Sequence, residues 1–496
     1  MRTVTGPTDT VVVVGAGLGG LSAALHLAGA GRHVTVVERE PVPGGRAGLI
    51  HDHGYRFDTG PTVLTMPNLV ADALAAVGEE LDDWLTLHRL DPAYRARFAD
   101  GSTIDVRADV DAMAAEIATT CGARDAQGYR DFVAYLRRLY RLEMPQFIDR
   151  NLDSPRQLLR PSLVQLAAMG GFRRLGPKVA SFFADDRLRR LFSFQAMYAG
   201  LSPARALAIY AVITYMDCVE GVYFPEGGMH AVPRALAGAA ATHGVTFRWN
   251  TQVTSIDVSG GRARGVITTS GERIPADVVV VNADLPTSYE RLLPPGYASR
   301  RVRRLRYSPS AVVLHAGSNA SFPHAAHHTI EFGAAWNETF AELIRDRVLM
   351  SDPSFLLTNP TRTDPSLAPA GRHTYYALFP APNLDPRRSG RIDWTAERDR
   401  YRDEIVATIE KRGYTGFADG IECEHLVTPA DWKAMGLAAG APFAAAHDFG
   451  QTGPFRAPTL DRRIPNLVFC GSNTQPGVGV PMVLVSGKLA AQRVTG

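Results

Sequence analysis

Three glycines near the start of the chain have the spacing of a dinucleotide-binding turn. Gly15, Gly17 and Gly20 form G-x-G-x-x-G directly after the apolar run VVVV. In such a turn the first glycine permits a tight bend, the second lets the backbone approach a pyrophosphate, and the third allows a helix to pack closely on a strand. Glu38, at the end of the next apolar stretch, can accept hydrogen bonds from ribose hydroxyls. These residues predict a dinucleotide site.

The surrounding sequence predicts the elements that position these residues. Residues 11–14 have the pattern of a buried strand, 21–30 of a helix rich in small residues, and 33–38 of a second strand. The phosphates would lie at the N-terminus of the helix, where free N–H groups and the helix dipole attract anions. The acid at the end of the second strand favours an unphosphorylated ribose, and therefore NAD or FAD rather than NADP.

The residues after the second strand favour FAD. The motif GGR places Gly45 and Arg46 where a glycine admits close backbone approach and a guanidinium can neutralise phosphate; a surface-loop arginine is the alternative interpretation. The motif FDTGPT adds a second turn, which contains Gly60, Pro61 and Thr62. In this order the motifs resemble the carotenoid desaturase branch of the flavin amine oxidase superfamily, and within it the bacterial phytoene desaturases.

The resemblance extends over nearly the whole chain in the family's order. GVYFPEGGMHAVPRALA resembles the turn that returns the chain to the FAD domain. VTFRWNTQVTSI resembles the segment in which a valine, here Val253, contacts the adenine side of the cofactor, and ADVVVVNADLP resembles the strand that closes this segment. LVFCGSNTQPGVGVPMVLVSGKLAAQRV resembles the family's last motif. The resemblance is therefore to the desaturase branch and not only to dinucleotide-binding proteins in general.

The last motif also has the pattern of a strand, a glycine turn and a helix. LVFC is the predicted strand and Gly471 the turn, while Gly477 and Gly479 bring bare backbone to the start of a helix at Val480. The N-terminus of such a helix can hold negative charge that develops on a flavin ring. A turn that is buried for packing alone is the other interpretation.

Three residues of this motif depart from the commoner family form. Ser472 and Asn473 stand where alanine and glycine are common, and Gln475 stands where many members have histidine. A proton-transfer role for that histidine therefore cannot be transferred to this chain.

Dinucleotide-type segments at the start, middle and end of the chain predict one domain assembled from separated pieces. We expect an α/β protein whose discontinuous Rossmann-type FAD-binding domain comprises residues 8–85, 221–290 and 455–496. Residues 86–220 have mainly helical periodicity and are assigned to a membrane-facing subdomain through which the substrate enters. Residues 291–454 mix strands and helices and are assigned to an inserted, mixed-sheet substrate domain.

The resemblance implies FAD-dependent desaturation of a long polyene hydrocarbon in carotenoid biosynthesis, from phytoene to lycopene or an intermediate. In this reaction a hydride leaves one saturated carbon for flavin N5, and a proton leaves the adjacent carbon. The substrate has almost nothing to hydrogen-bond, so its affinity must come from burial in an apolar tunnel, at about 25 cal/mol per Å². Oxygen or a quinone is the expected electron acceptor, because the sequence has no second nucleotide motif for NADH.

Two other functions remain open. A flavin amine oxidase-like enzyme for a polar substrate would need an aromatic cage and usually a lysine near the flavin, and lysine is scarce in this chain. A non-redox isoprenoid-binding protein of the same fold would lack a complete flavin site, whereas GGR and the C-terminal motif are both present.

A basic segment is the candidate for membrane contact. Residues 156–190 interleave arginines with leucine, phenylalanine and methionine, a pattern suited to an anionic lipid surface, although a solvated charged face is the ordinary alternative. The resemblance places Arg160 where family members carry an arginine near the substrate channel. Arg160 is therefore the candidate polarising catalytic residue, with a plain surface arginine as the other interpretation. We expect a cytoplasmic protein, peripheral at the inner face of the cell membrane.

Composition and spacing argue against several other classes of function. A formal net charge of +3 is too small to indicate nucleic-acid binding. The four cysteines are far apart and form no C-x-x-C pair, which argues against a disulfide framework or a zinc site and fits a reducing compartment. His324, His327 and His328 precede Glu331 without the H-E-x-x-H pattern, so no metal is expected. The sequence does not indicate an oligomeric state.

Overall fold

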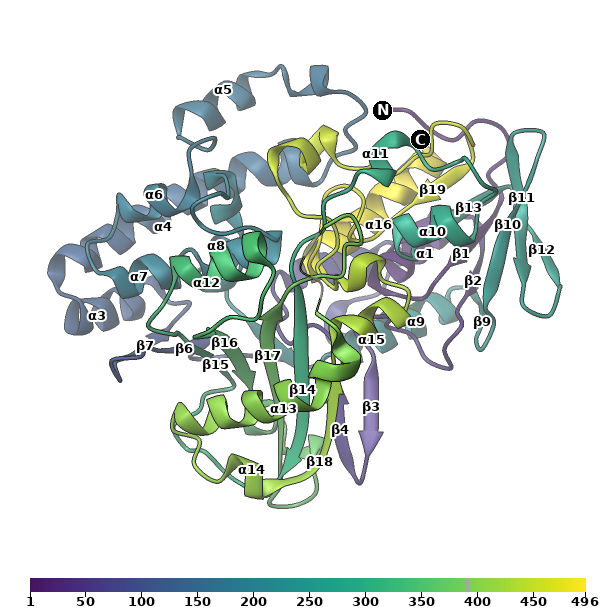
Figure 1. The fold of residues 1–496 in the computed structure, drawn as a ribbon. Coiled ribbons are helices and arrows are strands. Elements are labelled where there is room, and N and C mark those ends of the chain that lie inside the picture. The colour runs from purple at the N-terminus through teal and green to yellow at the C-terminus, as the bar shows by residue number, and fades with distance from the viewer. Residues whose placement is uncertain (389, 391) are drawn as a thin grey trace.

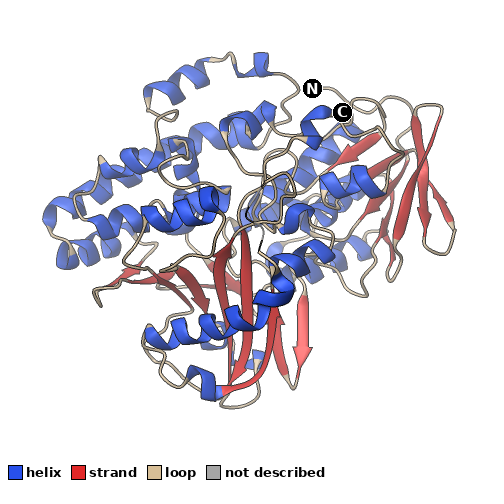
Figure 2. Ribbon diagram, in the orientation of Figure 1, coloured by secondary structure: helices blue, strands red, loops and turns tan. Residues whose placement is uncertain are grey.

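The computed structural model describes residues 1–496 except 389 and 391. Two large sheets and a group of helices make up the fold (Figure 1, Figure 2). In these views the parallel sheet lies to the right, the mixed sheet lies below, and most of the helices from the first half of the chain lie to the upper left.

The glycine-rich N-terminus belongs to a five-stranded parallel sheet assembled from distant segments. Its strand order is β19–β13–β1–β2–β9, and the strands are β1 (Thr10–Val14), β2 (His33–Val37), β9 (Thr246–Arg248), β13 (Val278–Val281) and β19 (Leu467–Phe469). Two runs of four valines lie side by side, because β1 and β13 pair from Val11 with Val278 to Val14 with Val281. The prediction of a discontinuous Rossmann-type fold, with pieces from the start, middle and end of the chain, is confirmed.

The valines of β1 are buried because both faces of this sheet are covered. Val11 and Val13 face helices α1 (Leu18–Gly29), α9 (Ala231–Thr242) and α16 (Val480–Thr495). Val12 and Val14 face a three-stranded sheet of β10 (Val253–Ser259), β11 (Arg262–Thr268) and β12 (Arg273–Pro275). Strands covered on both faces have continuous apolar runs in place of alternation, as the sequence has here.

The second large sheet has seven strands in the order β18–β14–β17–β16–β15–β6–β7. Five of them come from the later part of the chain: β14 (Ser310–Ser318), β15 (His328–Glu331), β16 (Phe355–Thr358), β17 (His373–Ala381) and β18 (Ile421–Val427). The pairings are antiparallel except that of β15 with β6, so the sheet is mixed, as predicted. Helix α13 (Trp394–Lys411) packs Tyr401 and Ile405 against it.

The prediction of helix is wrong for residues 87–106. These residues form β5 (Leu87–Arg89), β6 (Tyr94–Arg97) and β7 (Thr103–Val106), and the last two extend the mixed sheet. In β6, buried Tyr94 and Ala96 alternate with half-buried Arg95 and Arg97, which is the period of a strand with one covered face. The short strand was missed because its long, partly apolar arginine stems also fit a helical pattern.

The helices that follow pack as one layer beside the mixed sheet. They are α3 (Val110–Thr120), α4 (Ala123–Glu143), α5 (Pro161–Ala168), α6 (Leu175–Ala180), α7 (Asp186–Leu191) and α8 (Ala211–Cys218). Helix α4 contacts both α3 and α8, while α5 lies at the outer edge of the layer (Figure 1). Among the helices of the described residues, none has both the length and the apolar character needed to cross a bilayer.

Candidate functional site

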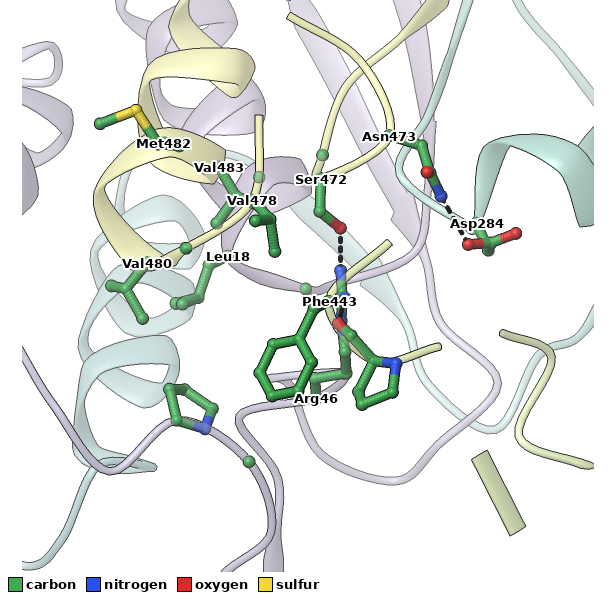
Figure 3. A pocket seen from close by; sticks show the side chains of 18 of the residues that line it. Leu18, Arg46, Asp284, Phe443, Ser472, Asn473, Val478, Val480, Met482 and Val483 are labelled. Carbon is green, nitrogen blue, oxygen red and sulfur yellow. Dashed lines mark hydrogen bonds between the residues drawn. The ribbon is translucent and has the colours of Figure 1, made fainter. Parts of the chain in front are cut away.

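A cavity of about 1020 Å³ lies where the parallel sheet, the mixed sheet and the helical layer meet. Most of the predicted cofactor-binding residues line it, namely Gly15, Gly17, Glu38, Gly45, Arg46, Gly60, Pro61, Thr62, Val253, Gly471, Gly479 and Val480. Figure 3 shows part of this wall, with Leu18, Val478 and Val480 on one side and the polar pair Asn473 and Asp284 on the other. The fold therefore brings together motifs from both ends and the middle of the chain.

Glu38 is tied to the first glycine turn. Its Oε2 accepts a hydrogen bond from the Ala16 N–H at 2.6 Å, and its Oε1 accepts one from the Glu40 N–H at 3.0 Å. These contacts hold the turn against the end of β2 and keep the carboxylate at the cavity wall. Each carboxylate oxygen can accept more than one hydrogen bond, so ribose hydroxyls can share it.

Asn282, which the sequence reasoning missed, is packed among the glycine turns. A Cβ atom on Gly17 would lie 2.7 Å from its Nδ2, and one on Gly19 would lie 2.8 Å from its Oδ1. A Cβ atom on Gly471 would lie 3.1 Å from the same Oδ1. Asn282 directly follows β13, and parallel strands present their carboxyl ends at one edge of a sheet. The second run of four valines was therefore the signal that could have found it.

Gly20 and Gly477 are not among the described residues that line the cavity. A Cβ atom on Gly20 would lie 2.1 Å from the carbonyl oxygen of Gly15, so this glycine lets α1 start directly against the turn. A Cβ atom on Gly477 would lie 2.2 Å from Nε2 of His447, so this glycine makes room for an imidazole that does line the cavity. Direct cofactor contact by Gly20 and Gly477 stays a prediction.

Arg46 projects between the cofactor loop and the C-terminal turn. Its guanidinium donates hydrogen bonds to the carbonyl of Pro442 and to Oγ of Ser472 (Figure 3). Burial lowers the pKa of Arg46, and the nearby charge of Asp284 acts in the opposite direction. An arginine keeps its charge under such conditions, so the cavity wall holds a cation that suits a diphosphate.

Asn473 connects the C-terminal turn to another part of the wall. Its Nδ2 donates a hydrogen bond to Oδ2 of Asp284 at 2.7 Å, and its Oδ1 accepts one from the Ala445 N–H at 2.9 Å. Asp284 also caps α10 (Leu285–Arg291) by accepting from the Thr287 N–H at 3.3 Å, and burial raises the pKa of Asp284. Two of the three departures from the family pattern, Ser472 and Asn473, therefore make specific side-chain hydrogen bonds in this chain.

The buried Arg456 supports the same turn from behind. Its Nε donates to the carbonyl of Thr474 at 2.9 Å, its Nη2 donates to the carbonyl of Ser472, and its Nη1 donates to the carbonyl of Gln451 at 3.3 Å. Burial lowers the pKa of Arg456 to about 10. Its described hydrogen-bond acceptors are all backbone carbonyls, so a largely uncompensated positive charge lies behind residues 472–474.

Asp58 joins the FDTGPT turn to the start of α9. Its carboxylate accepts hydrogen bonds from the backbone N–H groups of Met229 at 2.8 Å and His230 at 2.9 Å. The Nδ1 atom of His230 lies 2.8 Å from the carbonyl oxygen of Ala47, directly after GGR. Burial raises the pKa of Asp58 to about 6. Two motifs distant in sequence are thus fixed to each other by one carboxylate and one imidazole.

The side-chain amide of Gln475 is occupied by backbone groups. Its Oε1 accepts from the Leu152 N–H at 3.1 Å, and its Nε2 donates to the carbonyls of Leu152 at 2.8 Å and Gly453 at 3.2 Å. These contacts fasten the loop after α4 to the C-terminal turn. An amide does not titrate near neutral pH. Gln475 therefore has a structural role here and does not take up a proton.

The wall around the glycine turns fits a dinucleotide cofactor. Glycine lets the two loops that line the cavity here approach each other closely, since a Cβ atom on Gly60 would lie 2.0 Å from the carbonyl oxygen of Arg46. The first residues of α1 and α16, Leu18 and Val480, both line the cavity, so two helix N-termini reach it. Together with the cation of Arg46 and the acceptor of Glu38, these features match diphosphate and ribose groups.

The rest of the cavity is mainly apolar. Side chains from the helical layer line it, including Phe147, Ile148, Leu158, Leu163, Leu166, Ile213 and Met216. Two carboxyl groups also line it, and burial raises the pKa of Glu143 well above its usual value and that of Asp217 to about 7. Carboxyl groups with raised pKa values hold their protons over most of the acidic range, so this region suits an apolar ligand.

The candidate catalytic residue Arg160 lies at the edge of this region. It is half-buried, directly before α5, and is not among the described residues that line the cavity, whereas Arg150 is. Two leucines of α5, Leu163 and Leu166, line the cavity. A catalytic role for Arg160 stays a prediction. The cavity is lined at this point by Leu163 and Leu166 in place of Arg160.

Comparisons with known proteins agree with this geometry. A family model described as "Flavin containing amine oxidoreductase" matches residues 18–495. A phytoene dehydrogenase of Streptomyces griseus is 59% identical over 496 residues, covering 100% of this chain and 97% of that protein. A zeta-carotene-forming phytoene desaturase of Myxococcus xanthus is 38% identical, covering 98% of this chain and 93% of that protein.

Solved structures show the same fold at low sequence identity. An engineered putrescine oxidase has a TM-score of 0.63 at 17% identity, covering 98% of this chain and 99% of that chain. An oxidoreductase from Methanosarcina mazei has a TM-score of 0.61 at 16% identity, covering 97% of this chain and 99% of that chain. At these identities the likeness concerns the fold alone.

Proposed function

Because this chain belongs to the family of flavin containing amine oxidoreductases, we propose that it is an FAD-dependent desaturase of phytoene in carotenoid biosynthesis. The reaction removes hydrogens from adjacent saturated carbons of a long polyene hydrocarbon and gives lycopene or an intermediate. The observation that carries the proposal is the similarity to a phytoene dehydrogenase over the whole chain. A cavity with a polar, glycine-lined part and an apolar part fits both the cofactor and the substrate.

The residues that would hold FAD are those of the glycine-lined part. Glu38 would bind the ribose, Arg46 and the N-terminus of α1 the diphosphate, and Val253 the adenine side. When bound, oxidised FAD supplies a hydride acceptor that amino-acid side chains lack. The turn at 471–479 and the N-terminus of α16 contribute N–H groups and a helix dipole, which favour negative charge near them.

The apolar part would hold the hydrocarbon by burial and exclude water from it. Side chains of the helical layer and of the mixed sheet form this region, and Glu143 and Asp217 add polar atoms that stay protonated over the acidic range. At about 25 cal/mol per Å² of apolar surface, burial of a long hydrocarbon provides ample affinity. The chain's own contribution is therefore to bind, orient and keep dry the carbons that react.

The proposal includes a membrane surface at α5, on the cytoplasmic face of the cell membrane. The side chains of Leu159 and Val164 are 78% and 70% exposed, and Phe172 is 39% exposed. Phe172 also lines the cavity, as do Leu158 and Leu163, so the exposed apolar surface is continuous with the cavity wall. Arginines flank this surface, which suits anionic headgroups. A bilayer would supply a substrate that is insoluble in water, and oxygen or a quinone would accept the electrons.

Reconstitution with FAD and phytoene tests the proposal. We expect the purified protein to show a flavin absorption band near 450 nm after FAD is added, and to turn liposomes that contain phytoene coloured under air or with a quinone. Absence of the flavin band would contradict every enzymatic function considered for this chain. A flavin band with oxidation of an amine such as putrescine, and no polyene product, would favour an amine oxidase instead.

A further inference from the structure

The desaturation proposed above releases a proton, and few groups in the cavity can take it up. Both polar atoms of Gln475 are hydrogen-bonded to backbone. The two carboxyl groups of the apolar part, Glu143 and Asp217, are buried and held towards their protonated forms, while those of Glu38 and Asp284 already accept hydrogen bonds within the wall. Among the described residues that line the cavity, His447 is the one histidine. A neutral imidazole always has one nitrogen with a free lone pair.

The imidazole of His447 is placed beside the C-terminal turn. Its Nε2 occupies the space that a side chain at Gly477 would need, because a Cβ atom there would be 2.2 Å away. The residues on either side of Gly477, Pro476 and Val478, line the cavity together with His447. The ring edge that carries Nε2 therefore lies against the part of the wall that the helix N-terminus of α16 completes.

Backbone hydrogen bonds of residue 447 hold the ring in place. The His447 N–H donates to the carbonyl of Ala199 at 2.9 Å, and its carbonyl accepts from the Tyr210 hydroxyl at 2.6 Å. The Nδ1 atom is buried and has no hydrogen-bond partner among the described residues. Other buried histidines of the described chain also have an unpartnered ring nitrogen, but His447 is the one whose residue lines the cavity, where a ligand can meet it.

We propose that His447 is the catalytic base of the desaturation, with Nε2 accepting the proton; this rests on the proposed function. One C–H bond of the substrate breaks and its electron pair leaves with the hydrogen as hydride, which the oxidised FAD of the proposed function accepts. The C–H bond on the adjacent carbon breaks, its electron pair forms the new C=C bond, and its proton goes to Nε2. The imidazole then releases this proton before the next turnover.

A weak base is sufficient for this step. Loss of hydride places positive charge on the substrate, and a C–H bond next to such a charge is strongly acidic. Burial and the charge of Arg456 lower the pKa of His447 well below its usual value, while the Ala199 carbonyl acts in the opposite direction. The imidazole is therefore neutral before reaction, which avoids placing a bare charge in an apolar cavity.

The groups around His447 also favour loss of the proton from the protonated imidazole. The positive charge of Arg456, which is hydrogen-bonded to the C-terminal turn, repels a protonated imidazole at His447. Asp448, the nearest acid in sequence, is bound to Arg306, with its Oδ2 at 2.7 Å from Nε. Tyr210 donates its hydroxyl proton to the His447 carbonyl and leaves the ring nitrogens free. The protonated ring is thus a short-lived state.

Substitutions of His447 test the proposal. We expect H447Q and H447N to bind FAD at the wild-type stoichiometry and to show thermal midpoints near that of H33Q, a control at an exposed histidine. Single-turnover desaturation of phytoene should fall by about 10²- to 10⁴-fold, the usual loss on removal of a general base. With deuterium on the carbon that loses the proton, the kinetic isotope effect on this rate should be larger in H447Q than in the wild type. A rate within about threefold of wild type, or an unchanged isotope effect, would overturn the proposal.

A chemical measurement keeps the proposal testable on the unaltered chain. Diethyl pyrocarbonate should modify His447 in the FAD-loaded protein, as read by peptide mass, and bound phytoene should protect it. Modification that phytoene does not reduce would contradict the assignment. The variants E143Q and D217N test the two acids of the apolar part. An isotope effect that changes in either variant, and not in H447Q, would also overturn the assignment of His447 as the base. Absence of desaturation by the wild type refutes the proposed function itself, whereas active H447Q refutes only the base.

Discussion

The side-chain amide of Asn473 donates a hydrogen bond of 2.7 Å to the carboxylate of Asp284, 189 positions away in the chain. The same amide accepts from the Ala445 N–H. One side chain thus fixes the C-terminal turn to the start of α10 and to the loop that carries His447. The residue is therefore a structural support of the cavity wall, although its position lies in a motif that the sequence assigns to the cofactor.

We expect N473A to weaken both folding and FAD binding. The substitution leaves a buried backbone N–H and a partly buried carboxylate oxygen without these partners, which costs about 1–3 kcal/mol. Urea unfolding and FAD titration by fluorescence measure the two effects. N337A, at an exposed asparagine, is the matched control and should be close to wild type. Equal stability of N473A and N337A would contradict the support role.

We expect R46M to lower the affinity for FAD by about 10- to 100-fold, since a charge-assisted hydrogen bond to phosphate contributes about 1.5–3 kcal/mol. S472A removes only the hydroxyl that Arg46 contacts, so its effect should be smaller. Isothermal titration of the apoprotein with FAD compares these variants with R300M, at an exposed arginine. Wild-type affinity in R46M would show that the cation lies away from the diphosphate.

Gly477 and His447 should be energetically coupled. A methyl group at 477 collides with Nε2 of the imidazole, so G477A is expected to lose about 1–3 kcal/mol of stability. In the background of H447A the collision is absent, so the same glycine substitution should cost less and retain only the backbone strain of a φ of +156°. A double-mutant cycle from thermal or urea unfolding measures the coupling. Additive effects would show that the ring and the turn do not touch.

The stability of the protein should depend on Asp217 as the pH changes. Burial raises the pKa of this carboxyl from 3.8 in the unfolded chain to about 7 in the folded state. Its stabilising contribution is therefore complete below about pH 4 and is lost as the pH rises through about 7. Between pH 5 and 7 the unfolding free energy of wild type should fall relative to D217N by on the order of 1 kcal/mol per pH unit. Urea unfolding at several pH values checks this slope; a difference that is constant from pH 5 to 8 would contradict it.

The exposed apolar side chains of the α5 region should control membrane binding. We expect L159S combined with V164S to reduce co-sedimentation with liposomes that contain anionic lipid, while FAD binding stays at the wild-type level. The reason is that both side chains are exposed and have apolar surface that only a lipid or a ligand would cover. V348S removes a similarly exposed valine elsewhere and is the control. Unchanged sedimentation of the double variant would place the contact on another surface.

The local features of the cofactor site could be predicted from the sequence because each depends on neighbouring residues. Gly15 and Gly471 have φ values of +99° and +101°, a backbone conformation that glycine adopts without strain. Gly15 directly follows β1, Gly471 comes two residues after the end of β19, and each turn leads into a helix. The conformation of such a turn depends on its own residues, so the motif predicts it. The same reasoning correctly predicted a discontinuous Rossmann-type fold with pieces from the start, middle and end of the chain.

The tertiary structure decided which side chains meet in the cavity. Arg456 and His447 lie in segments without a motif, and Asn282 lies in a segment that was assigned only as a strand; each reaches the cofactor turns through tertiary contacts. Their roles come from packing, burial and hydrogen-bond partners, none of which is encoded in the spacing of nearby residues. Strands β6 and β7 depend on long-range packing in the same way, since β6 joins the mixed sheet by pairing with β15, more than 200 residues later. The sequence by itself determined the turns and their ligand class, and long-range packing decided the groups that surround the reacting atoms.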